Sequence, residues 1–135
     1  MFEKPRIIKF SRIGRPSIGY ISPLENEINI PFKIKRVFYT YFTPQSVVRG
    51  KHANRKTVEL LIALCGKIIV TTETPDSKPL KYVLDKPNKG LYIPPYNWIT
   101  MKYSHTAVQL VLASTLYQEE YYIRDYNKFK KIKAK

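Results

Sequence analysis

Residues 49–70 read RGKHANRKTVELLIALCGKIIV and join a segment around one histidine to a long apolar run. Side chains alternate between the two faces of an extended strand. In VELLIALC this alternation leaves both faces apolar, which is typical of a strand buried between two sheets or beneath a partner. In VRGKHAN it predicts Gly50, His52 and Asn54 on one face and Arg49 and Lys51 on the other. We therefore expect His52 and Asn54 to look into the mouth of a barrel.

Short runs rich in β-branched and aromatic residues recur along the chain, between turn signals such as TPDSKP, DKPNKG and PPYN. The segments expected to be strands are RIIKF, FKIKRVFYTYF, VELLIALCGKIIVTTE, LKYVLD, GLYIP, WITMKYS and AVQLVLAS. Only the end, YQEEYYIRDYNKFKKI, suits a short helix, and YYIRDY within it is expected to pack the C-terminal segment. Strands this closely spaced predict an all-β sandwich or barrel that occupies residues 1–135 as one domain.

The formal charge of +14 is the strongest signal in the composition. Such an excess indicates an anionic partner: a nucleic acid, a phosphorylated small molecule or a membrane surface. Five of the lysines lie in KFKKIKAK, residues 128–135, which is expected to be a solvated basic tail. The rest of the charge is spread along the chain without a nucleic-acid-binding motif.

The chain shows no sequence signal for secretion or for a membrane. No segment approaches the ~20 consecutive apolar residues that cross a bilayer, and the N-terminus MFEKPRIIKF carries charges where a signal peptide has its apolar core. The single cysteine, Cys65, has no partner for an internal disulfide and is expected to be a buried, inert thiol. These features favour a cytoplasmic protein.

The spacing around the histidine, Gly50, then His52-x-Asn54, then Glu59 and a later glycine, resembles the first motif of the cupins. The second cupin motif brings a further histidine, but GLYIPPYNW has Trp98 there. Only His52 and Glu59 remain of four usual ligand positions, so no metal is expected. A histidine can still take and give a proton near neutral pH, or it can satisfy a buried hydrogen bond. The other histidine, His105, is expected at the surface.

Five longer strings, found in the same order, resemble the nucleotide-linked 4-keto-6-deoxyhexose 3,4-ketoisomerases, which are metal-free cupins of bacterial sugar biosynthesis. The strings are IPFKIKRVFYTY, RGKHANRK, LDKPNKGLYIPPYNW, LVLAS and EYYIRDYNKF. The resemblance runs from about Ile7 to Phe129, nearly the whole chain. It implies a cupin-type jelly-roll β-barrel and an isomerase. Members of this family form dimers with exchanged N-terminal strands, and RIIKF is a suitable strand for that exchange.

The resemblance also implies the chemistry. The substrate is a dTDP-linked 4-keto-6-deoxyglucose, whose carbonyl moves from C4 to C3 by proton transfers through an enediol, without a redox cofactor. His52 matches the position of the proton-transferring base, and Asn54 and Tyr39 complete the candidate catalytic group. The 3-keto product then goes to an aminotransferase, which yields a 3-amino-3,6-dideoxy sugar for a surface polysaccharide.

A second group of residues is expected to bind the substrate. Arginine and lysine side chains suit a diphosphate, whereas the aromatic side chains either contact the thymine and the sugar or belong to the core or an interface. The candidate substrate-binding and nucleotide-binding residues are Arg36, Phe38, Arg49, Lys51, Tyr92, Trp98, Ile18 and Ile99. For Tyr39, too, the sequence leaves open whether the ring contacts the substrate or belongs to the core or an interface.

The chain departs from the family pattern at four of these candidate positions. Phe38 stands where the family has a tyrosine, and Asn54 stands where it has a second histidine; asparagine does not titrate near pH 7. Ile18 and Ile99 are apolar where relatives carry polar side chains. These two positions are expected to choose the face of C4 that receives the proton, so the gluco or galacto configuration of the product stays open.

Two other functions compete with the ketoisomerase. The first is a sugar-nucleotide epimerase, which begins with the same proton abstraction but leaves the carbonyl at C4. The second is a non-catalytic basic β-barrel that binds a sugar nucleotide or a nucleic acid, because such barrels combine basic grooves with stacking rings. The aromatic and basic residues fall in strings that the ketoisomerase pattern already explains, which disfavours the nucleic acid.

Overall fold

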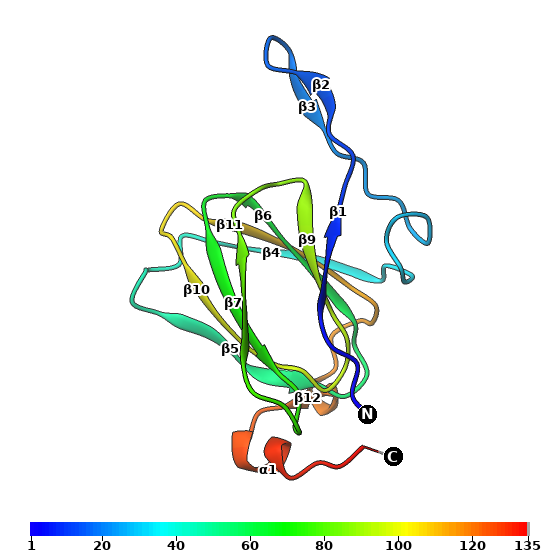
Figure 1. Cartoon of the computed structure of the whole chain (residues 1–135), viewed down its shortest axis with the longest axis vertical. Coiled ribbons are helices and arrows are strands. Elements are labelled where there is room, and N and C mark those ends of the chain that lie inside the picture. The colour runs from blue at the N-terminus through cyan, green and yellow to red at the C-terminus, as the bar shows by residue number, and fades with distance from the viewer. Residues whose placement is uncertain (135) are drawn as a thin grey trace.

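Two five-stranded antiparallel sheets pack face to face in the computed structural model, which describes residues 1–134 (Figure 1). The first sheet runs in the order β1 (Arg6–Lys9), β9 (Lys89–Ile93), β6 (Glu59–Cys65), β11 (Val108–Ala113) and β4 (Arg36–Tyr41). The second runs β12 (Tyr122–Ile123), β5 (Val48–Asn54), β10 (Trp98–Tyr103), β7 (Ile68–Glu73) and β8 (Leu80–Leu84). The predicted all-β architecture is confirmed.

The run VELLIALCGKIIVTTE was predicted as a single strand, and this is wrong. β6 lies in the first sheet and β7 in the second, so the turn at Gly66 carries the chain from one sheet to the other. Gly66 has φ +74°, and a side chain there would meet the Cα of Ala107 at 2.7 Å. Only glycine fits this turn without strain, and it divides the apolar run into two strands.

A hairpin that the sequence pattern did not predict projects from one end of the barrel (Figure 1). It consists of β2 (Ile13–Arg15) and β3 (Gly19–Ile21), and all six strand residues are exposed. We call residues 13–21 the N-terminal hairpin. β1 pairs with β9 of the same chain, and the exchange of this strand between two subunits stays a prediction.

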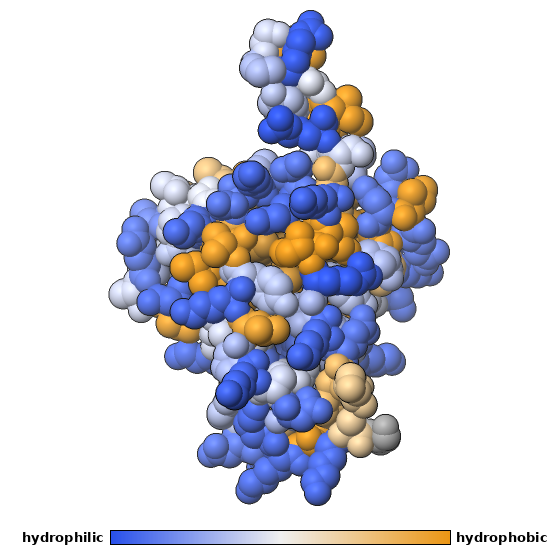
Figure 2. Space-filling view, viewed as in Figure 1, coloured by the Kyte–Doolittle hydropathy of each residue, from blue (hydrophilic) through white to orange (hydrophobic). Residues whose placement is uncertain are grey.

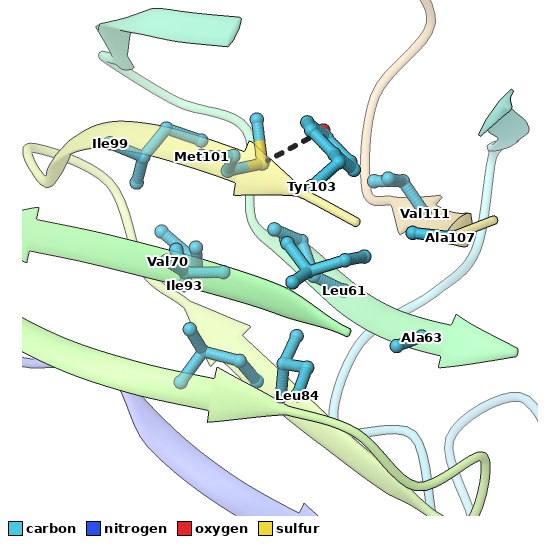
Figure 3. Packing of buried hydrophobic residues seen from close by; sticks show 12 residues of the cluster. Leu61, Ala63, Val70, Leu84, Ile93, Ile99, Met101, Tyr103, Ala107 and Val111 are labelled. Atoms are coloured by element: carbon cyan, nitrogen blue, oxygen red, sulfur yellow. Dashed lines mark hydrogen bonds between the residues drawn. The ribbon is translucent and has the colours of Figure 1, made fainter. Parts of the chain in front are cut away.

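β6 is buried on both faces, as its sequence predicted. Leu61 and Ala63 join the cluster between the sheets, where Figure 3 shows Leu61 facing residues of β10. Leu60 and Ile62 point the other way, into a cluster with Ile30. The outer face is therefore covered by the chain's own N-terminal segment rather than by a second sheet. Burial ends before Cys65, which is exposed, so the prediction of a buried thiol is wrong.

The C-terminal segment forms a 3₁₀ turn (Glu119–Tyr121), β12 and the helix α1 (Tyr126–Lys130). Asp125 caps the helix by accepting a hydrogen bond from the Lys128 backbone N–H at 3.0 Å. Phe129 is fully buried against Trp98. The expectation of a solvated tail over residues 128–135 is thus wrong for Phe129, whereas Lys128 is exposed as predicted. Lys135 lies outside the described residues.

Polar side chains cover most of the face seen in Figure 2, and a band of apolar side chains crosses the middle of the barrel. Within residues 1–134, no helix has the length and apolar character that crossing a membrane requires. The cytoplasmic location stays a prediction.

The covering of β6 by the N-terminal segment can be tested with two leucines of the same strand. Leu60 has no exposed surface, whereas Leu64 is 47% exposed. We expect Leu60→Ala to lower the free energy of unfolding by about 2–5 kcal/mol, because it leaves a cavity in the core. The matched variant Leu64→Ala should change it by under about 0.5–1 kcal/mol. Urea unfolding measures both, and equal losses would show that residues 22–34 do not cover this face.

Candidate active site

A cavity of about 220 Å³ lies between the two sheets. Six strands and the segment after β12 contribute to its wall. The lining residues are Phe38, Thr40, Arg49, Gly50, His52, Glu59, Leu61, Ile99, Met101, Tyr103, Gln109, Val111, Tyr122 and Arg124. Figure 3 shows Ile99, Met101 and Tyr103 side by side on β10 above Leu61, so this part of the wall is continuous with the core.

His52 lines the cavity with one ring nitrogen already engaged. Its Nδ1 lies 3.1 Å from the carbonyl oxygen of Gly50. A carbonyl can only accept a hydrogen bond, so Nδ1 carries the proton and Nε2 keeps its lone pair. Burial lowers the pKa of His52 below its ordinary 6.5, and the nearby Arg124 lowers it further. The imidazole is therefore neutral at pH 7, with Nε2 able to act as a base.

A bulge in β5 explains how His52 is placed. His52 pairs with Ile99 and Gly50 pairs with Thr100, so Lys51 is an extra residue in the strand. Gly50 and Lys51 have φ values of +88° and +59°, both left-handed. A bulge of this kind reverses the side-chain alternation in the strand. The carbonyl of Gly50 is turned back toward the His52 ring by the same distortion.

The reversal corrects one prediction from the sequence. Simple alternation placed Arg49 opposite His52, and this is wrong, because Arg49 and His52 line the same cavity. Lys51 does lie away from the cavity and is exposed. Alternation failed because it assumes a regular strand, and the left-handed residues at the bulge break that assumption.

Glu59 is a second titratable group in the cavity wall, fully buried on β6. Its Oε1 accepts a hydrogen bond of 3.5 Å from Nδ2 of Asn54. Burial raises the pKa of Glu59 to about 7, although the charge of Arg36 opposes this shift. The sequence drew attention to Glu59 only as a leftover position of the cupin metal motif, and nothing in the local pattern indicated its burial.

Two residues of the C-terminal segment complete the cavity at His52. The ring of Tyr122 lies edge-on to the imidazole, with the ring centroids 5.0 Å apart. The guanidinium of Arg124 lies over the Tyr122 ring, 4.6 Å from the ring centroid. YYIRDY packs the C-terminal segment, as expected, through Ile123 and Tyr126. Tyr122 and Arg124 also line the cavity, which the sequence did not indicate.

Arg124 is held by an exposed carboxylate. Its Nε and Nη2 donate to the two oxygens of Glu119 at 2.6 and 3.0 Å, and Tyr117 donates a third hydrogen bond to Glu119. The Arg124 hydrogen bonds, followed by that of Tyr117, lower the pKa of Glu119 to about 2. Glu119 is thus ionised at all ordinary pH values and fixes Arg124 beside the cavity.

Phe38 and Ile99 also lie where the sequence placed them, in the wall of the cavity. Arg36 lies behind Phe38, with its guanidinium 5.2 Å from the ring centroid. The Nε of Arg36 is buried and has no hydrogen-bond partner among the described residues, and Oδ1 of Asn54 is in the same condition. Both atoms lie near Glu59, so this corner of the wall holds unsatisfied polar groups.

The remaining predicted residues lie elsewhere in the single chain. Tyr39 is 64% exposed on β4 and stacks on Tyr41, so it does not line the cavity. Tyr92 is buried beneath the Arg6 guanidinium, and Trp98 packs on α1. Of the two roles that the sequence left open for these aromatic rings, Tyr92 and Trp98 thus take the core role.

Ile18 lies in the turn of the N-terminal hairpin, where it is 67% exposed, and it is not among the residues that line the cavity. It does not meet Ile99 within one chain, although the two were predicted to act together. His105 is exposed, as predicted. Within residues 1–134, no three His, Cys, Asp or Glu side chains are grouped so that they could hold a metal ion.

Comparisons with known proteins identify the family to which this chain is similar. Residues 3–134 match the protein family described as "FdtA: WxcM-like, C-terminal". A TDP-4-oxo-6-deoxy-alpha-D-glucose-3,4-oxoisomerase of Aneurinibacillus thermoaerophilus is 39% identical over 132 residues, covering 96% of this chain and 93% of the relative.

Two solved structures extend the similarity to the fold. The sugar 3,4-ketoisomerase QdtA of Thermoanaerobacterium thermosaccharolyticum, in complex with TDP, is 37% identical, with a TM-score of 0.90 over 96% of this chain and 94% of its own. The TDP-quinovose 3,4-ketoisomerase WlaRB of Campylobacter jejuni is 34% identical, with a TM-score of 0.89 over 97% of this chain and 100% of its own. A variant of QdtA was solved with TDP-4-keto-6-deoxyglucose.

The bulge can be tested with two glycines that share a left-handed backbone. A side chain at Gly50 would meet the carbonyl oxygen of Ile99 at 2.7 Å, whereas a side chain at Gly19 meets nothing within 4 Å. We expect Gly50→Ala to lower the free energy of unfolding by about 1–3 kcal/mol more than Gly19→Ala. Urea unfolding of both variants measures the difference. Equal effects would mean that the close approach to β10 does not constrain β5.

Proposed function

Because the chain belongs to the FdtA/WxcM-like family of dTDP-sugar 3,4-ketoisomerases, we propose that it converts TDP-4-keto-6-deoxyglucose to the 3-keto isomer with His52 as the base. One observation carries the proposal: a neutral imidazole, with Nδ1 bound to the Gly50 carbonyl, lines a cavity between the sheets. The relative from Aneurinibacillus thermoaerophilus bears the name of this reaction.

The reaction needs a base that can also return its proton. A hydrogen on a carbon next to a carbonyl is acidic enough for a positioned base, so Nε2 of His52 takes the proton from C3. The C–H electron pair forms a double bond between C3 and C4, and O4 gains a proton to give the enediol. His52 then returns its proton to C4, while O3 loses its own and becomes the new carbonyl. Since C4 is reduced as C3 is oxidised, no external redox partner takes part.

The diphosphate of the substrate needs fixed cations. Arg49 and Arg124 both line the cavity, and arginine matches phosphate oxygens with two parallel hydrogen bonds. Two donors of Arg124 already bind Glu119. Arg49 therefore has more donors available for a phosphate. We assign Arg49 the main contact with the diphosphate, which accounts for part of the charge of +14.

The other finer expectations belong to the same proposal. The 3-keto product is the substrate for an aminotransferase, which yields a 3-amino-3,6-dideoxy sugar. In a homodimer, the projecting hairpin is the N-terminal element suited to exchange, and Ile18 would then meet a neighbouring chain. Ile99, which lies in the cavity wall, is the residue of this chain best placed to influence the face of C4 that is protonated.

The role of His52 is tested by its replacement. We expect His52→Gln to lower kcat by at least ~100-fold, since it removes the proton-transferring group. It should also abolish deuterium incorporation from heavy water into TDP-4-keto-6-deoxyglucose. The matched variant His105→Gln alters the exposed histidine and should keep full activity. NMR of the product separates the alternatives, because an epimerase leaves the carbonyl at C4. Full activity in His52→Gln would reject His52 as the base.

The diphosphate contact is tested by two neighbouring cations of β5. We expect Arg49→Gln to weaken TDP binding by roughly 10- to 100-fold, the effect of losing charge-assisted hydrogen bonds of about 1.5–3 kcal/mol. Lys51→Gln removes an equal charge on the other side of the strand and should change the Kd less than about 3-fold. Calorimetric titration with TDP measures both. Equal losses would indicate a general charge effect, and tighter binding of an oligonucleotide would favour a nucleic-acid-binding barrel.

A further inference from the structure

The proposed reaction moves protons on oxygen as well as on carbon. O4 must gain a proton and O3 must lose one for each turnover. His52 carries the proton between the carbons, and its Nδ1 is engaged by the Gly50 carbonyl. One imidazole with a single free nitrogen therefore leaves the oxygen protons without a carrier.

Few groups in the cavity wall can fill this gap. Arg49 and Arg124 are permanently protonated and do not exchange a proton near pH 7. Burial raises the pKa of Tyr103 to about 12, and its hydroxyl already donates to Gln109 at 2.7 Å. Glu59 is the one remaining carboxyl among the cavity-lining residues that the structure describes.

The sheet topology and one hydrogen bond define the position of Glu59. It projects from β6, in the sheet opposite His52, so the two side chains approach the cavity from different sheets. Its Oε1 accepts from Asn54, whose own Oδ1 has no partner among the described residues. Asn54 stands where the family pattern has a second histidine, and it does not titrate. Oxygen-bound protons in this chain therefore need a different carrier.

We propose that Glu59 is the acid and base for the sugar oxygens, opposite His52, which serves the carbons; this inference rests on the proposed ketoisomerase function. The Glu59 carboxyl gives its proton to O4 while His52 takes the proton from C3. In the second half, the Glu59 carboxylate takes the proton from O3 while His52 returns its proton to C4. O3 and O4 are on adjacent carbons, so one carboxyl can serve both. Both residues end as they began, and atoms and charges balance.

The surroundings of Glu59 suit this role. Burial keeps its pKa near 7, so the protonated form needed at the start is well populated at neutral pH. Arg36 from β4 acts on Glu59 through its charge, against the protonated form. The titratable groups that line the cavity with Glu59 are Arg49 and His52 from β5, Tyr103 from β10, Tyr122 from β12, and Arg124. Above about pH 7, Glu59 loses its proton, and the rate should fall.

The test compares two glutamates. We expect Glu59→Gln to lower kcat by ~100-fold or more while the Kd for TDP changes less than about 3-fold, since the contact with Asn54 can be kept. In wild-type protein kcat should fall as the pH rises through about 7, and Glu59→Gln should lose this limb. The matched variant Glu25→Gln alters an exposed glutamate and should match wild-type protein in kcat and pH profile.

The outcomes separate this inference from the proposed function. Wild-type protein without ketoisomerase activity overturns the proposed function and this inference with it. Active wild-type protein with kcat kept within about 3-fold in Glu59→Gln, or with the alkaline limb retained, overturns the inference alone. If Glu59→Gln fails to fold or to bind TDP, infrared spectra of wild-type protein with TDP decide. A protonated-carboxyl band that titrates with the alkaline limb supports the role of Glu59, and its absence contradicts it.

Discussion

The bulge at Gly50 and Lys51 is the constraint on which the site depends. Two left-handed residues in succession bring Arg49 to the same side of β5 as His52, which a regular strand keeps apart. They also turn the Gly50 carbonyl to the imidazole and so determine which ring nitrogen is free. Glycine is required there because a Cβ atom would lie 2.7 Å from the carbonyl oxygen of Ile99 on β10. One local distortion thus sets the position, the tautomer and the charged neighbour of the base.

The packing of the two sheets supplies the second condition for the site, because it shields His52 and Glu59 from water. The walls formed by Leu61, Ile99 and Val111 favour the neutral forms of His52 and Glu59. For His52 this lowers the pKa from 6.5, and for Glu59 it raises the pKa to about 7. At pH 7 the His52 imidazole is therefore largely neutral, and about half of the Glu59 carboxyl groups carry a proton. A neutral imidazole with a protonated carboxyl is the starting state which an enediol mechanism requires.

Much of the fold could be predicted from the sequence, because the strands are short, apolar and bounded by turn signals. His52, Arg49 and Ile99 could be named from motifs alone. The features that were missed depend on contacts between distant segments. The turn at Gly66 transfers the chain between sheets, the return of residues 117–124 brings Tyr122 to His52, and the bulge reverses a strand. A local sequence pattern does not indicate which distant segment will pack against it. For this reason the outward position of Tyr39 and the burial of Glu59 were also missed.

The central claim is that His52 is a neutral base with Nε2 free, and ¹⁵N NMR of the imidazole in the protein tests it most directly. The account predicts the Nδ1–H tautomer at pH 7, because the Gly50 carbonyl accepts from Nδ1, and a pKa below 6.5, because burial lowers it. An Nε2–H tautomer, or a ring that is protonated at pH 7, would contradict it.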